Sequence, residues 1–394
     1  MSVAYWQDKG RSGPEIETDL VVIGAGITGT SIAYWLQGSG LSVAVLDRGT
    51  VGAGATGRNA GFVTCGSVEH HHRMVAKHGK AVAKQLWQIG RDNIDLIESA
   101  LVNDGLQCDF RRGGAFSLAG TEHELEELAH SAALLADDGV PVEMLSAAEA
   151  EARLGCVGFP GGAFYPEDGE VHPVKLAEGI LARSGAAFYP HHEVFELEQC
   201  GDDTVRIHTS QGRFRAQAVV LATNGYSHLL DPWFAERIYP TRGQILVTEP
   251  APRHFMSAPC YCNFVLDYFR QLPDRRVLIG GFRQLDRERE IGVSDEPNPI
   301  IHEALEGFLQ RHFPDLHGVK VAYRWAGTMG FSVDGLPMIG ALPGRPQIYF
   351  AGGFTAHGIG MGFKVGQMMA RLITEGADPG PLSARRLSGK TPST

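Results

Sequence analysis

The alternation of apolar and polar positions predicts that the chain opens with a buried strand, a helix and a second strand. Leu20-Val-Val-Ile23 is a continuous apolar run, which is typical of a parallel strand that is covered on both faces. A helical pattern follows it, and a second apolar run spans residues 41–46. This strand–helix–strand order indicates an α/β fold with a doubly wound parallel sheet.

The same periodicities predict most of the remaining secondary structure. Apolar residues at three- and four-residue spacing indicate helices over 72–103, 122–135, 146–154, 173–184, 300–313 and from the last glycine turn to about residue 375. Apolar or alternating runs indicate strands at 193–197, 204–209, 213–215, 218–221, 244–248, 263–269, 276–281 and from 347. The strands between 244 and 281 are expected to be antiparallel. Residues 1–18 are expected to form an arm, and residues 161–173 are rich in turn formers.

Glycines at the first turn predict a dinucleotide site. Gly24 allows the sharp turn after the strand, Gly26 lets the backbone approach a pyrophosphate, and Gly29 lets the helix pack closely on the strand. Asp47 ends the second apolar run, where a carboxylate accepts hydrogen bonds from ribose hydroxyls and would repel the 2′-phosphate of NADP. The neighbouring Arg48 weakens that repulsion only slightly. The alternative is a glycine-rich turn in an ordinary α/β fold.

Three other segments are suited to a cofactor. Residues 52–61 are too glycine-rich for regular structure, and they offer backbone N–H groups, the hydroxyl of Thr56 and the charge of Arg58. Residues 218–226 predict a second buried strand that ends in a turn of small residues. Residues 347–362 predict a strand, a glycine turn and the start of a helix, whose N-terminus favours negative charge. The alternative for residues 52–61 is a solvent-exposed loop, and the alternative for residues 347–362 is a turn with a purely structural role.

Composition excludes several classes of protein. The 394 residues carry a net charge of −10, which argues against a nucleic-acid surface. The 50 glycines exceed the usual share of about 7%, as expected where the backbone approaches a large cofactor at several points. No apolar run is long enough to span a membrane, and the polar N-terminus does not resemble a signal peptide.

Cysteine and histidine usage indicates no metal. The six cysteines, at 65, 108, 156, 200, 260 and 262, have no metal-ligand spacing, and reduced thiols in a cytoplasmic enzyme are expected. His70, His71 and His72 are adjacent, and three adjacent side chains on one helix or strand cannot all face one ion. A solvated helix start is the expected role of the three histidines.

The order of the cofactor segments implies two domains. Because these segments are separated by long excursions, the cofactor domain is expected to be discontinuous, over residues 1–80, 150–235 and 322–394. Residues 81–149 and 236–321 are expected to build a substrate domain.

The motifs, taken in this order, resemble the D-amino-acid oxidase superfamily of flavoproteins. The resemblance covers nearly the whole chain. It rests on 24–29, 54–61, Ala222-Thr-Asn-Gly225-Tyr226, Arg242-Gly-Gln244, Trp325-Ala-Gly327, Asp334-Gly-Leu-Pro337 and the closing turn 352–362. Within the superfamily, Tyr5-Trp6-Gln7-Asp8 and the Trp-x-Gly motif are most similar to the gamma-glutamylputrescine group. The resemblance implies a Rossmann-type, glutathione-reductase-like FAD-binding domain with an inserted α+β substrate domain built on an antiparallel sheet.

The resemblance also implies a set of cofactor contacts. They are Gly24, Ala25, Gly26, Ile27, Thr28, Gly29, Asp47, Arg48, Gly54, Ala55, Thr56, Gly57, Arg58, Asn59, Ala60, Gly61, Val194, Ala222, Thr223, Asn224, Trp325, Gly327, Asp334, Gly353, His357, Gly358, Ile359 and Gly360. Members with covalent flavin attach it through a cysteine shortly before the Asp-x-x-Pro segment. This chain has none there, so noncovalent FAD is expected.

The carboxylate-binding residues of the superfamily are not matched. Sarcosine oxidases carry a lysine where Gly360 stands, and here Lys364 comes later. Glycine oxidases carry an arginine where Trp325 stands, and Arg324 is one position earlier. The specific substrate is therefore left open by the sequence.

The implied chemistry is transfer of a hydride from the carbon beside an amine nitrogen to flavin N5, which gives an imine. Arg58 and His357 are the candidates beside the flavin, and Arg324, Arg242, Tyr261 and Tyr268 are the candidates for contact with substrate. Each candidate also has a structural alternative. The arginines could form surface ion pairs, the tyrosines could pack between strands, and the histidine could be a hydrogen-bonded turn residue.

Three functions are left open. The first is an amine or amino-acid oxidase that produces hydrogen peroxide. The second is a dehydrogenase of the same fold that passes electrons to a quinone or an electron-transfer protein. The third is a flavin-binding subunit without turnover. The expected partners are a small amine or amino-acid substrate and oxygen or another acceptor, and a homo-oligomer is an open alternative to a monomer.

Overall fold

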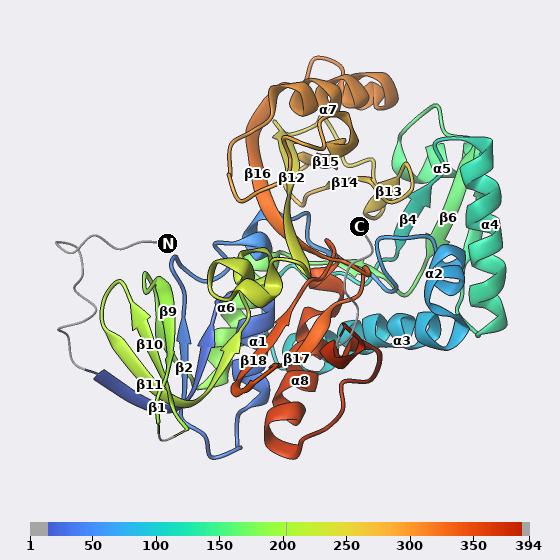
Figure 1. The fold of residues 1–394 in the computed structure, drawn as a ribbon. Helices are drawn as coiled ribbons and strands as arrows, with labels where there is room; N and C mark the ends of the chain where they lie inside the picture. The colour runs from blue at the N-terminus through green and yellow to red at the C-terminus, as the bar shows by residue number, and fades with distance from the viewer. Residues whose placement is uncertain (1–14, 202, 388–394) are drawn as a thin grey trace.

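The computed structural model describes residues 15–201 and 203–387 (Figure 1). Residues 1–14 of the expected arm, including Tyr5-Trp6-Gln7-Asp8, lie outside the described residues. Residues 15–18 do not belong to an arm, because they extend the first strand, β1 (Glu15–Ile23), and pair with residues 213–216.

The first of two large sheets contains the parallel strands that the apolar runs predict. Its order is β17-β18-β11-β1-β2-β8, and β10 and β9 follow antiparallel beside β11. The strands are β1, β2 (Val43–Leu46), β8 (Ala187–Tyr189), β9 (Val194–Gln199), β10 (Val205–Thr209), β11 (Arg213–Leu221), β17 (Met338–Leu342) and β18 (Arg345–Gly352). The central pairs β1–β2, β1–β11 and β11–β18 are parallel, whereas β17 at the edge is antiparallel to β18.

Both faces of this sheet are buried, as the continuous apolar run of β1 predicts. Leu20 and Val22 pack in a cluster with α1 (Ile27–Trp35) and α8 (Gly358–Glu375). Val21 and Ile23 pack on the opposite face, in a cluster that includes residues of β9 and β10. The alternation of side chains along a strand therefore divides one apolar run between two cores. Figure 1 shows α1, α6 (Pro173–Ser184) and α8 side by side.

The second sheet stands above the first and is mostly antiparallel. Its order is β16-β12-β15-β14-β13-β4-β6-β5, with only β13–β4 parallel. The strands are β4 (Ala115–Leu118), β5 (Glu143–Ser146), β6 (Gly161–Tyr165), β12 (Ile238–Thr248), β13 (Cys260–Cys262), β14 (Asp267–Gln271), β15 (Val277–Gly281) and β16 (Val321–Ser332). A small third sheet pairs β3 (Phe62–Val63) with β7 (Gly169–Glu170).

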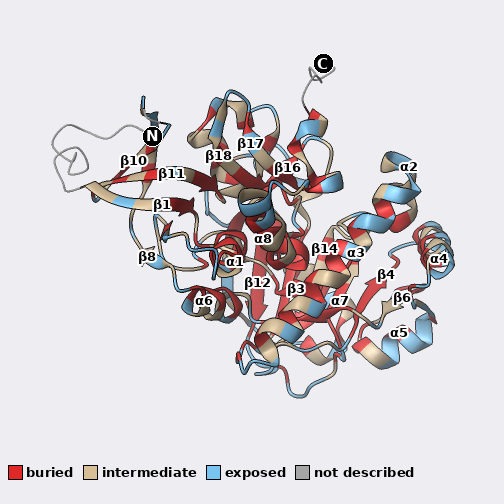
Figure 2. Ribbon diagram, turned by 90° about the horizontal axis from the view of Figure 1, so that it is seen from below, coloured by how far each residue is buried: buried red, intermediate tan, exposed pale blue. Residues whose placement is uncertain are grey.

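Three helices cover the second sheet, namely α4 (Glu122–Asp137), α5 (Ala147–Leu154) and α7 (Pro299–His312). Figure 2 shows exposed residues on the outward faces of α4 and α5, whereas the strands beneath them are mostly buried. Ser146 caps α5 with its hydroxyl, and Glu149 completes a capping box, so the start of this helix follows its sequence signature.

The long helix expected over 72–103 is wrong as a single element. It divides at Gly79, which has a φ of 84°, into α2 (His71–His78) and α3 (Lys80–Ile97). Only glycine adopts that conformation readily, so the chain turns there despite continuous apolar periodicity. The strand expected at 263–269 is also interrupted, because residues 263–266 form the turn between β13 and β14. Residues 161–165, expected as turn, form β6.

Two strands of the second sheet fall in ranges that the sequence assigns to the cofactor domain. They are β6, within 150–235, and most of β16, within 322–394. The domain boundaries themselves stay a prediction. All six cysteines carry free thiols, as the sequence predicts. Among the described residues, no helix combines the length and the apolar character that a membrane-spanning segment requires.

Candidate functional site

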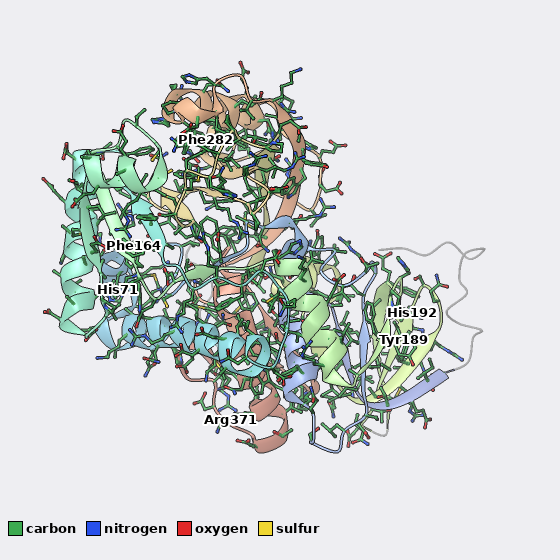
Figure 3. The ribbon with its side chains drawn as sticks, turned by 180° about the vertical axis from the view of Figure 1, so that it is seen from behind. His71, Phe164, Tyr189, His192, Phe282 and Arg371 are labelled. Atoms are coloured by element: carbon green, nitrogen blue, oxygen red, sulfur yellow. The ribbon has the colours of Figure 1, made fainter. Side chains whose placement is uncertain are left out.

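A cavity of about 520 Å³ lies between the two sheets. Its floor comes from the carboxyl ends of the parallel strands β1, β2 and β11, where ligands bind in open α/β sheets. Its roof comes from β12, β13, β14 and β16. Figure 3 labels His192, which lines the cavity on the side of the first sheet, and Phe282, which precedes Arg283 on the side of the second sheet, and the two lie in different parts of the molecule.

The first turn is organised by side chains that hold its backbone. Gly24 has a φ of 109°, and its N–H donates to the carbonyl oxygen of Leu46 at 2.7 Å. Asp47 accepts hydrogen bonds from the N–H groups of Ala25 (2.8 Å) and Gly49 (2.7 Å). The carboxylate therefore joins the ends of β1 and β2 while it also lines the cavity, where its remaining lone pairs can accept from ribose hydroxyls.

Two helix N-termini open into the same cavity. Residues 26–28 at the start of α1 line it, and Thr56 accepts a hydrogen bond from the N–H of Ile27 at 2.9 Å. Residues 357–360 at the start of α8 line it as well. Because helix N-termini carry partial positive charge, the cavity favours anions at two separated points.

His357 precedes α8 and is buried. Its Nε2–H donates to the carbonyl oxygen of Thr64 at 2.9 Å, since a carbonyl can only accept. Burial lowers the pKa of His357 to about 4, and the hydrogen bond to Thr64 opposes that shift only in part. The imidazole is therefore neutral at physiological pH.

Aromatic rings form the roof. Phe62 packs edge-on against Tyr261, with ring centroids 4.8 Å apart, and against Tyr268, with centroids 6.0 Å apart. Burial raises the pKa of both tyrosines, so their hydroxyls stay protonated at physiological pH. They can donate or accept hydrogen bonds without carrying charge.

Arg283 is a cation on the cavity wall that is not among the residues selected from the sequence. It follows β15 and lies over the ring of Phe331, with its guanidinium carbon 4.3 Å from the centroid. Burial lowers the pKa of Arg283 from its ordinary value, although the group stays charged. No residue in the part of the chain that the structure describes forms a hydrogen bond or ion pair with its side chain.

The structure gathers most of the expected site residues on the cavity wall. Those that line it are Gly24, Gly26, Ile27, Thr28, Asp47, Arg48, Gly54, Ala55, Thr56, Arg58, Asn59, Ala60, Val194, Ala222, Thr223, Asn224, Tyr261, Tyr268, Gly327, His357, Gly358, Ile359 and Gly360. Arg58 is fixed there by a hydrogen bond from Nη1 to the carbonyl oxygen of Ala326 (2.8 Å).

Other expected cofactor residues lie behind the wall and support it. Gly29, Gly57 and Gly61 are packed against neighbouring backbone, the N–H of Ala25 is bound by Asp47, and the N–H of Gly353 donates to Asn224 Oδ1 at 2.9 Å. The indole N–H of Trp325 donates to the carbonyl oxygen of Arg58 at 3.2 Å. These residues shape the loops of the cavity without lining it.

Three of the sequence-based assignments do not fit the structure. Arg324 pairs with Glu306 outside the cavity, because its side chain leaves β16 on the face opposite to Trp325. Arg242 is buried against Glu290 (3.2 Å), where it holds the 286–298 segment. Asp334 pairs with Arg386 at 2.7 Å and does not line the cavity.

Several wall residues were missed by sequence reasoning. They are Phe62, Val68, His192, Phe195, Leu229, Leu230, Val265, Leu266, Arg283, Thr328, Met329 and Phe354. For Arg283 one signal was present, because the Gly280-Gly281 pair at the end of a strand indicates close approach of the backbone to another group. The remaining residues are apolar or common types in turns and strands, and nothing in their local sequence marks them.

These features fit a flavin dinucleotide. A long cavity with two helix N-termini, a turn of glycines at the end of β1 and a carboxylate at the end of β2 suits an adenine nucleotide at one end and a ring system at the other. None of the six cysteines lines the cavity, in agreement with noncovalent attachment. The fold and the site together define a dinucleotide-dependent oxidoreductase.

Comparison with known proteins identifies the family. The profile of the DAO family, described as FAD dependent oxidoreductase, matches residues 19–372. The chain belongs to this family, and it is an FAD-dependent oxidoreductase of the group that oxidises amines and amino acids.

Individual relatives cover nearly the whole chain. Gamma-glutamylputrescine oxidoreductase of Escherichia coli (strain K12) is 27% identical over 380 residues, which cover 92% of this chain and 85% of that protein. Glycine oxidase of Geobacillus kaustophilus (strain HTA426) is 27% identical over 399 residues, which cover 94% and 98%. The crystal structure of the glycine oxidase from Geobacillus kaustophilus superposes with a TM-score of 0.79 at 23% identity, and covers 93% of this chain and 98% of that chain. The crystal structure of L-proline dehydrogenase from P. horikoshii superposes with a TM-score of 0.80 at 21% identity, and covers 94% of this chain and 96% of that chain. The two structures support the fold.

Proposed function

We propose that the protein is an oxidase of small amines that carry a carboxylate, with FAD bound noncovalently and oxygen as the electron acceptor. The observation that carries this proposal is Arg283, a cation on the cavity wall with no acidic partner among the described residues. Arg283 is partly buried, and a partly buried charge without an acidic partner is unfavourable, so a binding site that contains one is suited to a ligand of opposite charge.

The two tyrosines define where the rest of the substrate lies. Tyr261 and Tyr268 stand on the roof with Arg283, and their protonated hydroxyls can hydrogen-bond either the carboxylate or the amine. Contact of the substrate with two or three of these side chains would orient one of its C–H bonds toward the floor of the cavity. The apolar rings around them, with Phe62, exclude water from the bond that reacts.

The reaction does not need a general base supplied by a side chain of the protein. When bound, FAD supplies the two-electron acceptor for oxidation of the C–N bond. His357 is neutral and its Nε2–H is already committed to Thr64, while the tyrosines do not ionise near neutral pH. The substrate amine itself must therefore lose its proton to solvent before oxidation, and the rate is expected to rise with pH through the amine pKa.

The first experiment is an anaerobic flavin-reduction screen with matched pairs of amines. Each pair differs only in the carboxylate, such as sarcosine and dimethylamine, or proline and pyrrolidine. We expect bleaching of the flavin by carboxylated members. Equal reduction by the members without a carboxylate would contradict the role of Arg283, and no reduction by any amine would favour a flavin-binding subunit without turnover.

The first prediction concerns Arg283→Met. Loss of a charge-assisted hydrogen bond costs about 1.5–3 kcal/mol, so KM for a carboxylated substrate should rise about tenfold to a hundredfold. Arg283→Lys should recover part of the loss, because a lysine keeps the charge without the bidentate geometry. The measurement is steady-state kinetics at equal flavin content, and an unchanged KM in the methionine variant would remove Arg283 from the site.

The electron acceptor is tested separately. Hydrogen peroxide formed in air, at a rate equal to substrate consumption, is expected of the oxidase. Turnover only with an artificial acceptor would assign the protein to the dehydrogenases of the same fold, and it would leave the recognition of the carboxylate unaffected.

A further inference from the structure

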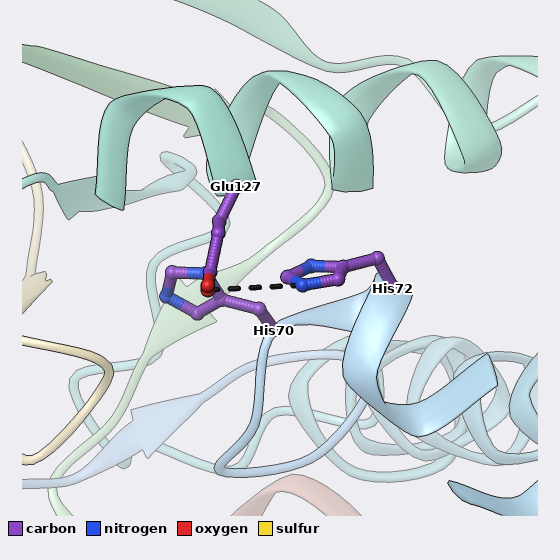
Figure 4. A group of neighbouring side chains, drawn as sticks. All are labelled: His70, His72 and Glu127. Atoms are coloured by element: carbon purple, nitrogen blue, oxygen red, sulfur yellow. Dashed lines mark ion pairs between the residues drawn. The ribbon is translucent and has the colours of Figure 1, made fainter. Parts of the chain in front are cut away.

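A cluster of two histidines and a glutamate lies outside the cavity that the cofactor and substrate use. His70 ends the loop before α2, His72 lies in the first turn of α2, and Glu127 lies on α4. Figure 4 shows the three side chains converging between these elements. One ligand atom from each residue lies within 4.8 Å of the others.

His70 is a buried side chain without hydrogen-bond partners among the described residues. Its imidazole is 2% exposed, and neither ring nitrogen makes a hydrogen bond. Nδ1 lies 3.7 Å from Glu127 Oε2, and Nε2 lies 3.6 Å from Glu124 Oε1. Metal-binding histidines commonly place one ring nitrogen on the metal and donate the other N–H toward a carboxylate, and the two sides of His70 have this arrangement.

His72 is oriented in the same way by a different partner. Its Nδ1 lies 2.9 Å from the hydroxyl oxygen of Ser131 on α4. With Nδ1–H as the donor, the lone pair is on Nε2, which lies 3.7 Å from Glu127 Oε2. Two ligand atoms on a tetrahedral zinc ion are about 3.4 Å apart, so both histidines stand close to the spacing that a shared ion would require.

His71 does not belong to the cluster. It is buried on another side of α2, where its ring meets the edge of Trp87 with centroids 5.7 Å apart. The expectation of a solvated helix start is wrong for His70 and His71, which are both buried. His70 lies outside the helix, so its side chain and that of His72 can face one point together with Glu127 from another element.

The charges near the cluster permit a divalent cation. Glu124 and Glu127 contribute two negative charges. Arg73 opposes one of them, because its Nε–H and Nη2–H donate to Oε2 and Oε1 of Glu127, both at 3.0 Å. Each carboxylate oxygen has two lone pairs, so Oε2 can accept from Arg73 and also bind an ion. Arg73 is then a competing cation that weakens the site without blocking it.

We propose that His70, His72 and Glu127 form a binding site for a divalent transition metal, with Zn²⁺ as the best match to two imidazole nitrogens and one carboxylate oxygen. The fourth position is left for water. The site would hold α2 against α4 and stabilise the β13–β14 turn, because Phe264 of that turn stacks on His70 with centroids 5.5 Å apart and its N–H donates to Glu124.

The test measures metal content of the holoenzyme. The purified flavoprotein is treated with a chelator and dialysed against Zn²⁺ at neutral pH, and bound zinc is quantified by mass spectrometry. We expect one zinc per chain, and we expect His72→Gln and Glu127→Gln each to lower zinc affinity by about tenfold or more. His317→Gln is the matched control, because that exposed histidine follows α7, pairs with the carbonyl oxygen of Gln310 and takes no part in the cluster, so its loss should leave zinc content unchanged.

Arg73→Met provides the discriminating variant. Removal of the competing cation should raise zinc affinity if the cluster is a metal site. In wild type, zinc should also slow hydrogen exchange at residues 263–266, a readout that is independent of catalysis. If His70 is only an ion-pair partner of the two glutamates, neither wild type nor Arg73→Met will retain zinc above the level of His72→Gln, and that result overturns the proposal.

Discussion

The two ends of the cavity are built in different ways. At the cofactor end much of the wall comes from three short contiguous segments, within 23–28, 53–60 and 356–360, that use backbone groups and small side chains. At the end where we propose that substrate binds, Tyr261, Tyr268 and Arg283 come from two strands and a turn that meet only when the second sheet assembles. A contiguous segment carries its geometry in its own sequence, whereas the position of a side chain on a convergent wall depends on how distant strands pair.

The largest expected effect is at the cofactor end, where Gly29→Ala should remove the flavin. A Cβ at this position would lie 1.8 Å from the carbonyl oxygen of Gly24, which is a backbone atom that cannot rotate away. Displacement of α1 from the turn should cost about 3 kcal/mol or more and separate the helix N-terminus from the pyrophosphate. The measurement is the ratio of flavin to protein absorbance after purification, together with urea unfolding.

Gly307→Ala is the matched control, since it also replaces a glycine inside a helix, α7. Apart from the neighbouring residues and the backbone of α7 itself, no described atom lies within 4 Å of a Cβ built there. Helix propensity alone predicts a gain of about 0.8–1.0 kcal/mol and unchanged flavin content. If both variants keep their flavin equally, the close packing of α1 on β1 is not what positions the cofactor.

The same contrast explains what could be predicted from sequence. The run 20–23, the glycine turn and Pro173 at the start of α6 each determine local structure through their own chemistry, and the elements appear where they were expected. Arg324 was misassigned because adjacent residues of a strand face opposite sides, and β16 was not recognised as a strand. Arg283 was missed because the Gly280-Gly281 pair before it indicates only a close approach of the backbone, and does not tell whether the arginine points into a cavity or to solvent.

A smaller effect is expected between the two ends, where His357 makes stability depend on pH. Its folded pKa of about 4 lies below the unfolded value of about 6.5. Between these values the unfolded chain binds a proton that the folded chain excludes, so the free energy of unfolding decreases as pH falls through this window, by up to about 1.4 kcal/mol per pH unit. His357→Gln should flatten this dependence in urea unfolding curves measured across the window.

The exposed His254 gives the control for that measurement. His254→Gln makes the same replacement at the surface and leaves the buried imidazole of His357 in place, so it should reproduce the wild-type dependence on pH. A slope in His357→Gln as steep as in wild type would mean that the buried carboxyl groups, rather than this histidine, control acid stability.

The smallest effect is expected at Arg324, and it separates the two possible carboxylate-binding arginines. Arg324 and Glu306 are about two-fifths exposed and form a surface pair, which contributes about 0–1 kcal/mol. Arg324→Ala should therefore change KM less than twofold, an effect smaller than the tenfold or larger increase expected of Arg283→Met.

Both variants remove one positive charge, so net charge and long-range attraction of an anionic substrate are matched between them. Equal increases in KM would mean that the substrate responds to the overall charge of the protein. An increase only in Arg324→Ala would return the substrate site to the outer face of β16, whereas an increase only in Arg283→Met is what a carboxylate bound at the roof requires.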